Sequence, residues 1–221
     1  MNILITSATA PFAQALAAAL SPEHNIRLTE RASVPQRNEI AVCPLAHDLS
    51  TNLLVRGMEA IIHVAEPLST DSAEGQIDHL TRATYNLCLA AANEGVRRLI
   101  YLNTLDVMAR YDPNYTVTER WRPVPSTEAG VLAKHLGEYT CREFAREHKL
   151  QIISLRLGHL TYTDDAPADS MALPLAEAIH AIQRALVIPA GNWSVIHLQH
   201  ESPTARFSSA KAQRMQLTIV N

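Results

Sequence analysis

The chain has 221 residues, of which 47% are hydrophobic and 19% charged, and its formal net charge is −3. This length and apolar fraction suffice to bury one substantial core, so we expect a single globular domain. Because the charge is slightly acidic and Lys and Arg are scattered rather than clustered, we expect neither nucleic acid nor an anionic membrane surface as a partner.

The first twenty residues are apolar but lack the organisation of a secretory signal. No basic segment precedes the apolar run, and Pro11 divides it into a strand and a helix. No run approaches the ~18 uninterrupted apolar residues that a membrane span needs. Three cysteines far apart in the sequence argue against a disulfide framework or a zinc site. We therefore expect a cytoplasmic protein.

Short apolar runs alternate along the chain with longer segments of helical period. The runs typical of buried parallel strands are Asn2–Ile5, Asn25–Leu28, Glu39–Cys43, Ala60–His63, Arg98–Asn103, Gln151–Leu157 and Ser194–Leu198. The helical segments are Phe12–Leu20, Leu49–Arg56, Gly75–Glu94, Ala129–His148 and Leu173–Ala185. This order predicts an α/β fold, a doubly wound parallel sheet with helices on both faces and the first strand inside the sheet.

Two helix ends and one loop have clear signals. Gly95 follows the helical run NLCLAAANE and precedes the strand run RRLIYL, which predicts a left-handed glycine cap. Ser126 and Thr127 predict the N-cap of the helix over Ala129–His148. The segment TYTDDAPADSM, Thr161–Met171, is predicted to be a mobile loop.

The turn after the first strand has the layout of a dinucleotide-binding βα unit but none of its glycines. In G-x-x-G-x-x-G the glycines allow a tight turn, close approach of the backbone to pyrophosphate and close helix packing. Here Ser7, Ala10 and Ala13 occupy these positions. Pro11 starts a helix well but has no N–H to offer a phosphate. We expect weak NAD(P) binding or none.

Longer patterns cover nearly the whole chain. AIIHVAE at Ala60–Glu66 is similar to a strand ending in H-(L/V)-A-A, and ATYNLCLAAANEGVRRLIYLNT at Ala83–Thr104 to G-T-x-N-L-x-x-A-A-x-x-x-G-V-x-R-(F/L)-(V/I)-Y-x-S-S. AKHLGE at Ala133–Glu138 is similar to S-K-x-x-x-E, and LRLGHLTY to a strand ending in R-x-x-x-(V/L)-(Y/F). On these segments the chain resembles the extended short-chain dehydrogenase/reductase family, in its NAD-dependent epimerase/dehydratase group. The resemblance implies a Rossmann fold and an NAD or NADP cofactor.

The resemblance also implies a catalytic Ser/Thr that works with a tyrosine and a lysine in Y-x-x-x-K. Thr104 matches the hydroxyl and Lys134 the lysine, but Gly130 stands at the tyrosine position. In such a site the tyrosine is the general acid or base, and a nearby ammonium lowers its pKa. Loss of that group typically removes about 10²–10⁴ in rate, so little redox catalysis is expected.

Further positions are implied as cofactor contacts by the resemblance: Ser7, Ala10, Phe12, Glu30, Arg31, Asp48, Leu49, Val64, Ala65 and Lys134. Glu30 suits the free 2′-hydroxyl of NAD and Arg31 the 2′-phosphate of NADP, so the choice of cofactor stays open. Asp48 is either a contact to adenine or the N-cap of the helix that follows it.

Glu66 stands where the resemblance implies a small residue facing the pyrophosphate. A desolvated carboxylate there would repel a diphosphate; the alternative is a surface glutamate before Pro67. The ten histidines show no ligand spacing such as H-x-x-x-H, so no metal is expected.

Two functions stay open. The first is a degenerate member of the family that serves as a nucleotide-binding or interaction module, with a nucleotide or nucleotide sugar as its ligand. The alternative is an active NAD(P)-dependent oxidoreductase or epimerase on a nucleotide sugar or sugar acid, with another residue in place of the tyrosine. The resemblance further implies a homodimer through helices 75–94 and 129–148. It also implies a substrate lobe, here reduced to residues from about 160 to 221.

Overall fold

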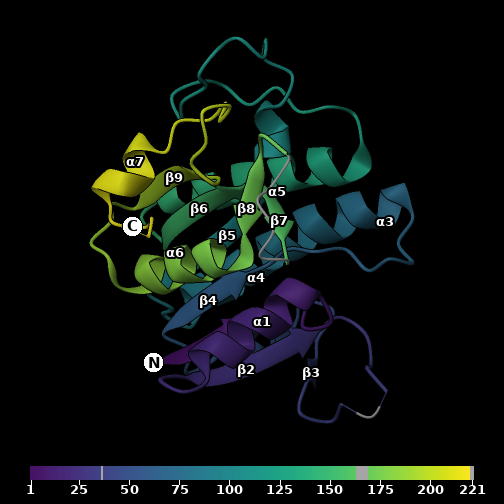
Figure 1. Ribbon diagram of the computed structural model, residues 1–221. Helices are drawn as coiled ribbons and strands as arrows, with labels where there is room; N and C mark the ends of the chain where they lie inside the picture. Colours follow the sequence, from purple (N-terminus) through teal and green to yellow (C-terminus); the bar gives the residue numbers. More distant parts are fainter. Residues whose placement is uncertain (36, 163–168, 220–221) are drawn as a thin grey trace.

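The structure is a computed structural model that describes residues 1–35, 37–162 and 169–219. It contains a seven-stranded parallel sheet in the order β3-β2-β1-β4-β5-β6-β9 (Figure 1). The strands are β1 (Asn2–Ile5), β2 (Asn25–Glu30), β3 (Ala41–Val42), β4 (Ala60–His63), β5 (Arg98–Thr104), β6 (Gln151–Leu157) and β9 (Trp193–Leu198). β1 lies between β2 and β4, which confirms the predicted interior position of the first strand.

Helices cover both faces of this sheet (Figure 1). On one face, α1 (Pro11–Leu20) and α6 (Leu175–Val187) share an apolar cluster with the strands. On the other face, α2 (Leu49–Val55), α4 (Thr84–Asn93) and α5 (Ala129–Arg146) share a second cluster. α3 (Ala73–Asp78) leads into α4 and packs against α5, and the short α7 (Ala210–Arg214) packs against β9. The predicted doubly wound architecture is confirmed.

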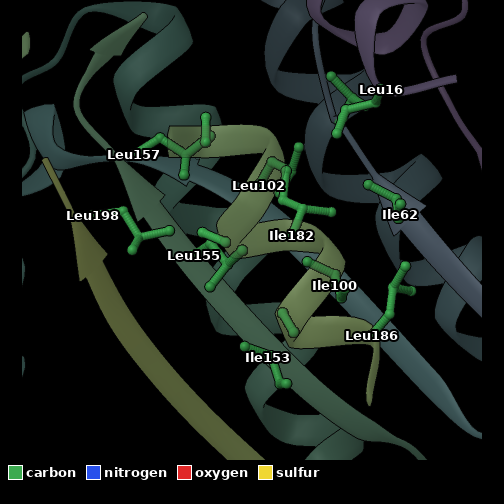
Figure 2. Packing of buried hydrophobic residues seen from close by; sticks show 14 of the residues in the cluster. Leu16, Ile62, Ile100, Leu102, Ile153, Leu155, Leu157, Ile182, Leu186 and Leu198 are labelled. Atoms are coloured by element: carbon green, nitrogen blue, oxygen red, sulfur yellow. The ribbon is translucent and has the colours of Figure 1, made fainter. Parts of the chain in front are cut away.

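Each central strand contributes to both clusters, because alternate side chains of a strand point to opposite faces. In β1, Ile3 and Ile5 lie in the cluster with α1 and α6, whereas Leu4 lies in the cluster with α2, α4 and α5. Figure 2 shows Ile182 and Leu186, one helical turn apart on α6, within the same cluster as the labelled residues of β5 and β6. Burial on both faces explains why the strand segments are almost continuously apolar.

The helix predicted over Gly75–Glu94 contains a π-helical turn, His79–Ala83, between α3 and α4. Within it the Thr84 hydroxyl donates to the carbonyl oxygen of Leu80 at 2.7 Å. A Cβ on Gly137 of α5 would lie 2.7 Å from that same oxygen, so only glycine lets α5 approach the π turn this closely. Single-turn π bulges are frequent at functional sites.

Several predicted boundaries are wrong. Two short strands pair in parallel, β7 (His159–Thr161) and β8 (Ala172–Pro174), and β8 delays the helix predicted from Leu173 until Leu175. A 3-10 turn (Leu105–Met108) follows β5, and the strand predicted over Glu39–Cys43 shrinks to β3. In the predicted loop Thr161–Met171, residues 163–168 lie outside the described residues, and Thr161 ends β7.

The glycine cap is confirmed, whereas the other cap is assigned to a different residue. Gly95 has φ +75°, in the left-handed region that favours glycine. The N-cap of α5 is Glu128 rather than Ser126 or Thr127, because its carboxylate accepts from the Gly130 amide at 3.1 Å and the Val131 amide at 2.9 Å. Among the helices of the described ranges, none combines the length and apolar character of a membrane span.

Candidate functional site

A cavity of about 380 Å³ opens at the carboxyl ends of β1, β4, β5 and β6. Ligands of open α/β sheets bind at this edge, and the volume lies near the lower end of the range for small-molecule sites, about 300–1,000 Å³. The structure brings six of the predicted positions to its wall: Ala10, Phe12, Val64, Thr104, Gly130 and Lys134. The other predicted cofactor positions are not among its lining residues: Ser7, Glu30, Arg31, Asp48, Leu49 and Ala65.

Lys134 on α5 reaches the strand ends with its ammonium group. Its Nζ donates to the carbonyl oxygens of Val64 at 2.8 Å and Leu102 at 3.0 Å, and lies 3.5 Å from a carboxylate oxygen of Glu66. Burial lowers the pKa of Lys134, and the nearby charge of Glu66 opposes that shift. The three N–H groups therefore have partners within the protein, so Lys134 would have to give up one of them to reach a ligand.

Thr104 closes β5 and begins the 3-10 turn that follows. Its hydroxyl donates to an Asp106 carboxylate oxygen at 2.7 Å and accepts from the Asp106 amide at 3.1 Å. The Thr104 amide donates to the side-chain oxygen of Asn103 at 2.8 Å. The hydroxyl predicted to steady a substrate oxygen is thus held by the turn that it caps.

Gly130 lies one helical turn before Lys134 and faces the same cavity. A Cβ on Gly130 would make ordinary contacts, 3.4 Å from the carboxylate oxygens of Glu128 and 3.6 Å from Gln76. Tyr162, which follows β7, is half-exposed, and burial together with the charge of Glu66 raises the pKa of Tyr162. Tyr162 is not among the described residues that line the cavity, whereas Gly130 is, so Tyr162 does not occupy the place of the missing tyrosine.

Ser7 links the β1–α1 turn to the loop after β4. These two loops and the ends of β2 and β3 are called the nucleotide side below. Its φ is +54°, a left-handed conformation that strains most side chains. The Ser7 hydroxyl donates to the Glu66 carbonyl oxygen and accepts from the Glu66 amide, both at 3.1 Å. The β1–α1 turn is therefore fixed to the loop after β4 by a side chain that glycine does not have.

The two residues predicted to distinguish NAD from NADP have partners within the protein. Glu30 is buried, and its carboxylate accepts from the Thr9 amide at 3.1 Å, the Thr9 hydroxyl at 2.7 Å and the Arg31 amide at 2.9 Å. The Arg31 guanidinium forms an ion pair with Asp71 of the loop after β4. Both side chains thus brace the loops around the nucleotide side.

Asp48 takes the N-cap role, the alternative that the sequence had left open. Its carboxylate accepts from the Ser50 hydroxyl and amide, and these hydrogen bonds lower the pKa of Asp48. The next residue, Leu49, is 66% exposed. After β4, Ala65 is buried and has φ +52°.

His63 fixes the end of β4 as a neutral imidazole. Thr84 donates its proton to Leu80, so it accepts from His63 Nε2 at 2.9 Å, and His63 Nδ1 then accepts from the Thr6 hydroxyl at 2.8 Å. Complete burial holds the pKa of His63 well below its usual value, and the charges of His79 and Lys134 add to this. The imidazole joins the end of β1 and β4 to the start of α4.

A cluster that the sequence did not reveal lies beside Thr104. His159 Nε2 is 3.0 Å from an Asp106 carboxylate oxygen, and its Nδ1 bonds Asp169. Burial lowers the pKa of His159, but the hydrogen bonds to Asp169 and Asp106 outweigh burial and raise it overall. A Cβ on Gly158 would overlap the Met171 carbonyl oxygen, so this glycine lets β7 approach β8 and places His159. In the sequence, the only hint of this cluster was the pair Gly158–His159 directly after the strand run that ends at Leu157.

A dinucleotide fits these residues poorly. At the start of α1, the Ala10 amide already donates to Ser7 and Pro11 has no N–H, which leaves Phe12 and Ala13 as the donors of the first turn. Glu66 adds a carboxylate to the cavity wall. In the described ranges, the structure places no group of three or more His, Cys, Asp or Glu residues that could hold a metal ion.

Comparison with known proteins gives concordant matches. The model of the NAD dependent epimerase/dehydratase family matches residues 3–193. A uronate dehydrogenase from Pseudomonas syringae pv. tomato is 23% identical, with 97% of this chain and 80% of that protein aligned. A glucuronic acid dehydrogenase structure from Chromohalobacter salexigens matches with a TM-score of 0.87 at 18% identity, over 100% of this chain and 84% of that one. A uronate dehydrogenase mutant from Agrobacterium tumefaciens, complexed with NAD, matches with a TM-score of 0.84 at 17% identity and the same coverage.

Proposed function

The chain belongs to the NAD dependent epimerase/dehydratase family, and we propose that it is a member with weak or no NAD(P) binding and little redox catalysis. In this proposal the Rossmann scaffold is kept as a binding or interaction module. The cavity at the strand ends is the binding site, and the sugar part of a nucleotide sugar is the class of ligand that this proposal assigns to it.

The observation that carries this proposal is the ion pair between Glu66 and Lys134. Both residues line the cavity, and the Glu66 carboxylate takes up the charge that Lys134 would offer to a ligand. A carboxylate at this place also repels a diphosphate. Gly130 supplies no proton-transferring group beside them, so the three parts of the family's catalytic set do not act together.

Isothermal titration calorimetry with NAD, NADH and NADPH tests this proposal. We expect dissociation constants weaker than about 100 μM. Restoring the turn with Ser7→Gly, Ala10→Gly, Ala13→Gly and Pro11→Phe together should increase affinity, and Glu66→Ala should increase it further. Sub-micromolar binding by the unaltered protein would overturn the proposal.

An active oxidoreductase or epimerase is the second candidate, favoured by the retention of Thr104 and Lys134 at one cavity. Turnover of a sugar acid or nucleotide sugar with NAD(P), abolished by Lys134→Ala or Thr104→Ala, would establish it. If the site has instead decayed from an enzyme, Gly130→Tyr in the turn-restored background should create reductase activity, because the phenol would lie one helical turn from the ammonium.

We also propose a homodimer through α4 and α5, as the family resemblance implies. Tyr85 on α4 and Tyr139 on α5 are 46% and 52% exposed and line a hollow of about 330 Å³ on this face. Exposed aromatic side chains are enriched at interfaces. Sedimentation should give a dimer that Tyr139→Glu dissociates, whereas a monomeric unaltered protein would contradict the proposal.

The whole chain, we propose, forms one Rossmann-like domain, since α6 and β9 share an apolar cluster with β1. A cytoplasmic location is proposed as well. Cys88 and Cys141 keep free thiols 3.9 Å apart, as expected in a reducing compartment. Fractionation of cells that express the tagged protein tests the location.

A further inference from the structure

We propose that the cavity selects a small polyhydroxylated ligand that carries an ammonium group, an amino sugar, and rejects sugar acids. This inference rests on the proposed function, because it assigns a ligand class to a cavity that no dinucleotide fills.

The first argument is the charge of the wall. Among the described residues that line the cavity, Glu66, Asp106 and Glu128 carry carboxylates and Lys134 carries an ammonium. Three negative groups against one positive group make the cavity acidic at neutral pH. This excess of negative charge attracts a cation and repels an anion.

The carboxylates are also held in place, and they come from three different elements. Two amides at the start of α5 fix Glu128. Thr104 and His159 bond Asp106, and Lys134 pairs with Glu66. A charge already oriented by protein donors loses little freedom when a ligand binds.

The imidazole beside the cavity does not reverse this balance. His159 is not among the lining residues, and it lies between Asp106 and Asp169. Even if the imidazole is protonated, the Asp169 carboxylate balances its charge. The surroundings of the cavity therefore keep the same excess of carboxylates.

Hydrogen-bond capacity points to the same ligand class. The Lys134 ammonium and the Thr104 hydroxyl already donate within the protein, whereas each carboxylate keeps free lone pairs. Sugar hydroxyls and an ammonium are donors that can use those acceptors. The carboxylate of a sugar acid only accepts, so beside Glu66, Asp106 or Glu128 it would meet an acceptor and negative charge.

Apolar side chains form the rest of the wall and limit the ligand's size. Phe12, Leu80, Leu102 and Leu157 offer surfaces on which the C–H face of a sugar ring can pack. The volume of about 380 Å³ suits a single ring rather than a dinucleotide. The cavity thus combines an acidic wall with an apolar one.

Calorimetric titration of the full chain with glucosamine, glucose and glucuronate at pH 7 tests the inference, since the three probes share a pyranose ring and differ in charge. We expect glucosamine to bind more tightly than glucose by on the order of tenfold, and glucuronate to bind less tightly than glucose. The preference for glucosamine should shrink at high ionic strength.

Charge-neutral variants locate the effect. Glu128→Gln and Glu66→Gln should each reduce the preference for glucosamine over glucose, measured as the ratio of the two dissociation constants on the same variant. Glu147→Gln, at the opposite end of α5, is the matched control and should keep the full preference. Circular dichroism verifies that each variant is folded.

The inference is overturned if glucuronate binds at least as tightly as glucosamine, or if glucosamine does not bind at millimolar concentration. It is equally overturned if Glu128→Gln and Glu66→Gln keep the preference that Glu147→Gln keeps. These outcomes can be distinguished from failure of the proposed function, which would be shown by tight binding of NAD or NADPH in the separate titration.

Discussion

Polar side chains at the ends of β2 and β3 are bonded within the protein, whereas those at the ends of β5 and β6 surround a cavity. On the nucleotide side, Glu30 braces the first turn, Arg31 pairs with Asp71 and Asp48 caps α2. On the cavity side, Asp106 also has protein partners, yet about 380 Å³ of space remains in front of it. The two sides belong to one binding edge of the sheet, and the cavity lies in front of the second.

This difference teaches that hydrogen bonds within the protein and space for a ligand are distributed unequally along one edge of the sheet. A glycine-rich turn leaves its amides free, but here Ser7 bonds the neighbouring loop through its hydroxyl. This hydrogen bond joins the two loops and occupies the Glu66 amide, which is then not free to donate to a ligand. On the cavity side Lys134 likewise has partners within the protein, but space remains beside it.

The largest expected effect comes from pH. Burial lowers the pKa of His79, whose surroundings include Arg31, to about 4, and that of His197, which lies beside Arg156, to about 3. In the unfolded chain a histidine has a pKa near 6.5. The unfolded state therefore binds more protons below that pH, so the free energy of unfolding falls as the pH falls from about 6.5 toward 4. Each such group contributes up to about 1.4 kcal/mol per pH unit.

Urea unfolding at pH 7, 6 and 5 measures how the free energy of unfolding changes with pH. Two variants separate the contribution of His79 from that of His197. His79→Asn removes the nucleotide-side contribution and His197→Asn the contribution near β9, so each should flatten the pH dependence. His47→Asn, at an exposed position, is the control. Buried His63 acts in the same direction, whereas the raised pKa of His159 acts in the opposite one. A free energy of unfolding that does not change from pH 7 to pH 5 would contradict the argument.

Gly158→Ala probes the cavity side. The added Cβ would overlap the Met171 carbonyl oxygen, a backbone atom that is also bonded to the His159 amide at 2.8 Å. Either β7 or β8 must move, so we expect a loss of about 3 kcal/mol in the free energy of unfolding and displacement of His159 from Asp106. Gly191→Ala is the matched control, because its Cβ would meet no heavy atom within 4 Å. Equal stability of the two variants would disprove the close approach.

Sequence periodicity was sufficient for the sheet because its signals are local. An apolar run followed by a turn and a helical segment identifies β1, and the step from NLCLAAANE to RRLIYL places the cap at Gly95. These signals depend on the preference of a few neighbouring residues for one conformation. They hold whether or not the site still binds its ligand.

The hydrogen bonds of the site could not be predicted in this way, because they join distant segments. Asp106 follows β5, His159 begins β7, and Asp169 precedes β8, so no spacing in the sequence connects them. The cap at Glu128 was missed because Ser126 and Thr127 are more usual N-caps, whereas a glutamate reaches two amides only in this geometry.

Glu30→Ala tests whether the nucleotide side is braced as described. The substitution leaves the Thr9 amide, the Thr9 hydroxyl and the Arg31 amide without their acceptor in a buried place, so we expect a loss of about 2 kcal/mol in the free energy of unfolding. Glu23→Ala, at an exposed position before the start of β2, should cost far less. Urea unfolding compares the two variants, and equal losses would mean that Glu30 stays available for a ligand.

The smallest expected effect separates the two properties of Ser7. Ser7→Ala and Ser7→Gly both remove the hydroxyl that bonds Glu66, but only glycine relieves the positive φ. We expect Ser7→Ala to lower the free energy of unfolding by about 1–2 kcal/mol and Ser7→Gly to lower it by about 1 kcal/mol less.

Hydrogen exchange at the Glu66 amide gives a second measurement for this pair. Both variants should speed exchange there, because the Ser7 hydroxyl accepts from that amide. Unchanged exchange would show that the link between the turn and the loop does not hold the nucleotide side closed. In that case the missing glycines, rather than the new hydroxyl, would separate this side from a dinucleotide site, and Ser7→Gly alone should then increase NAD affinity.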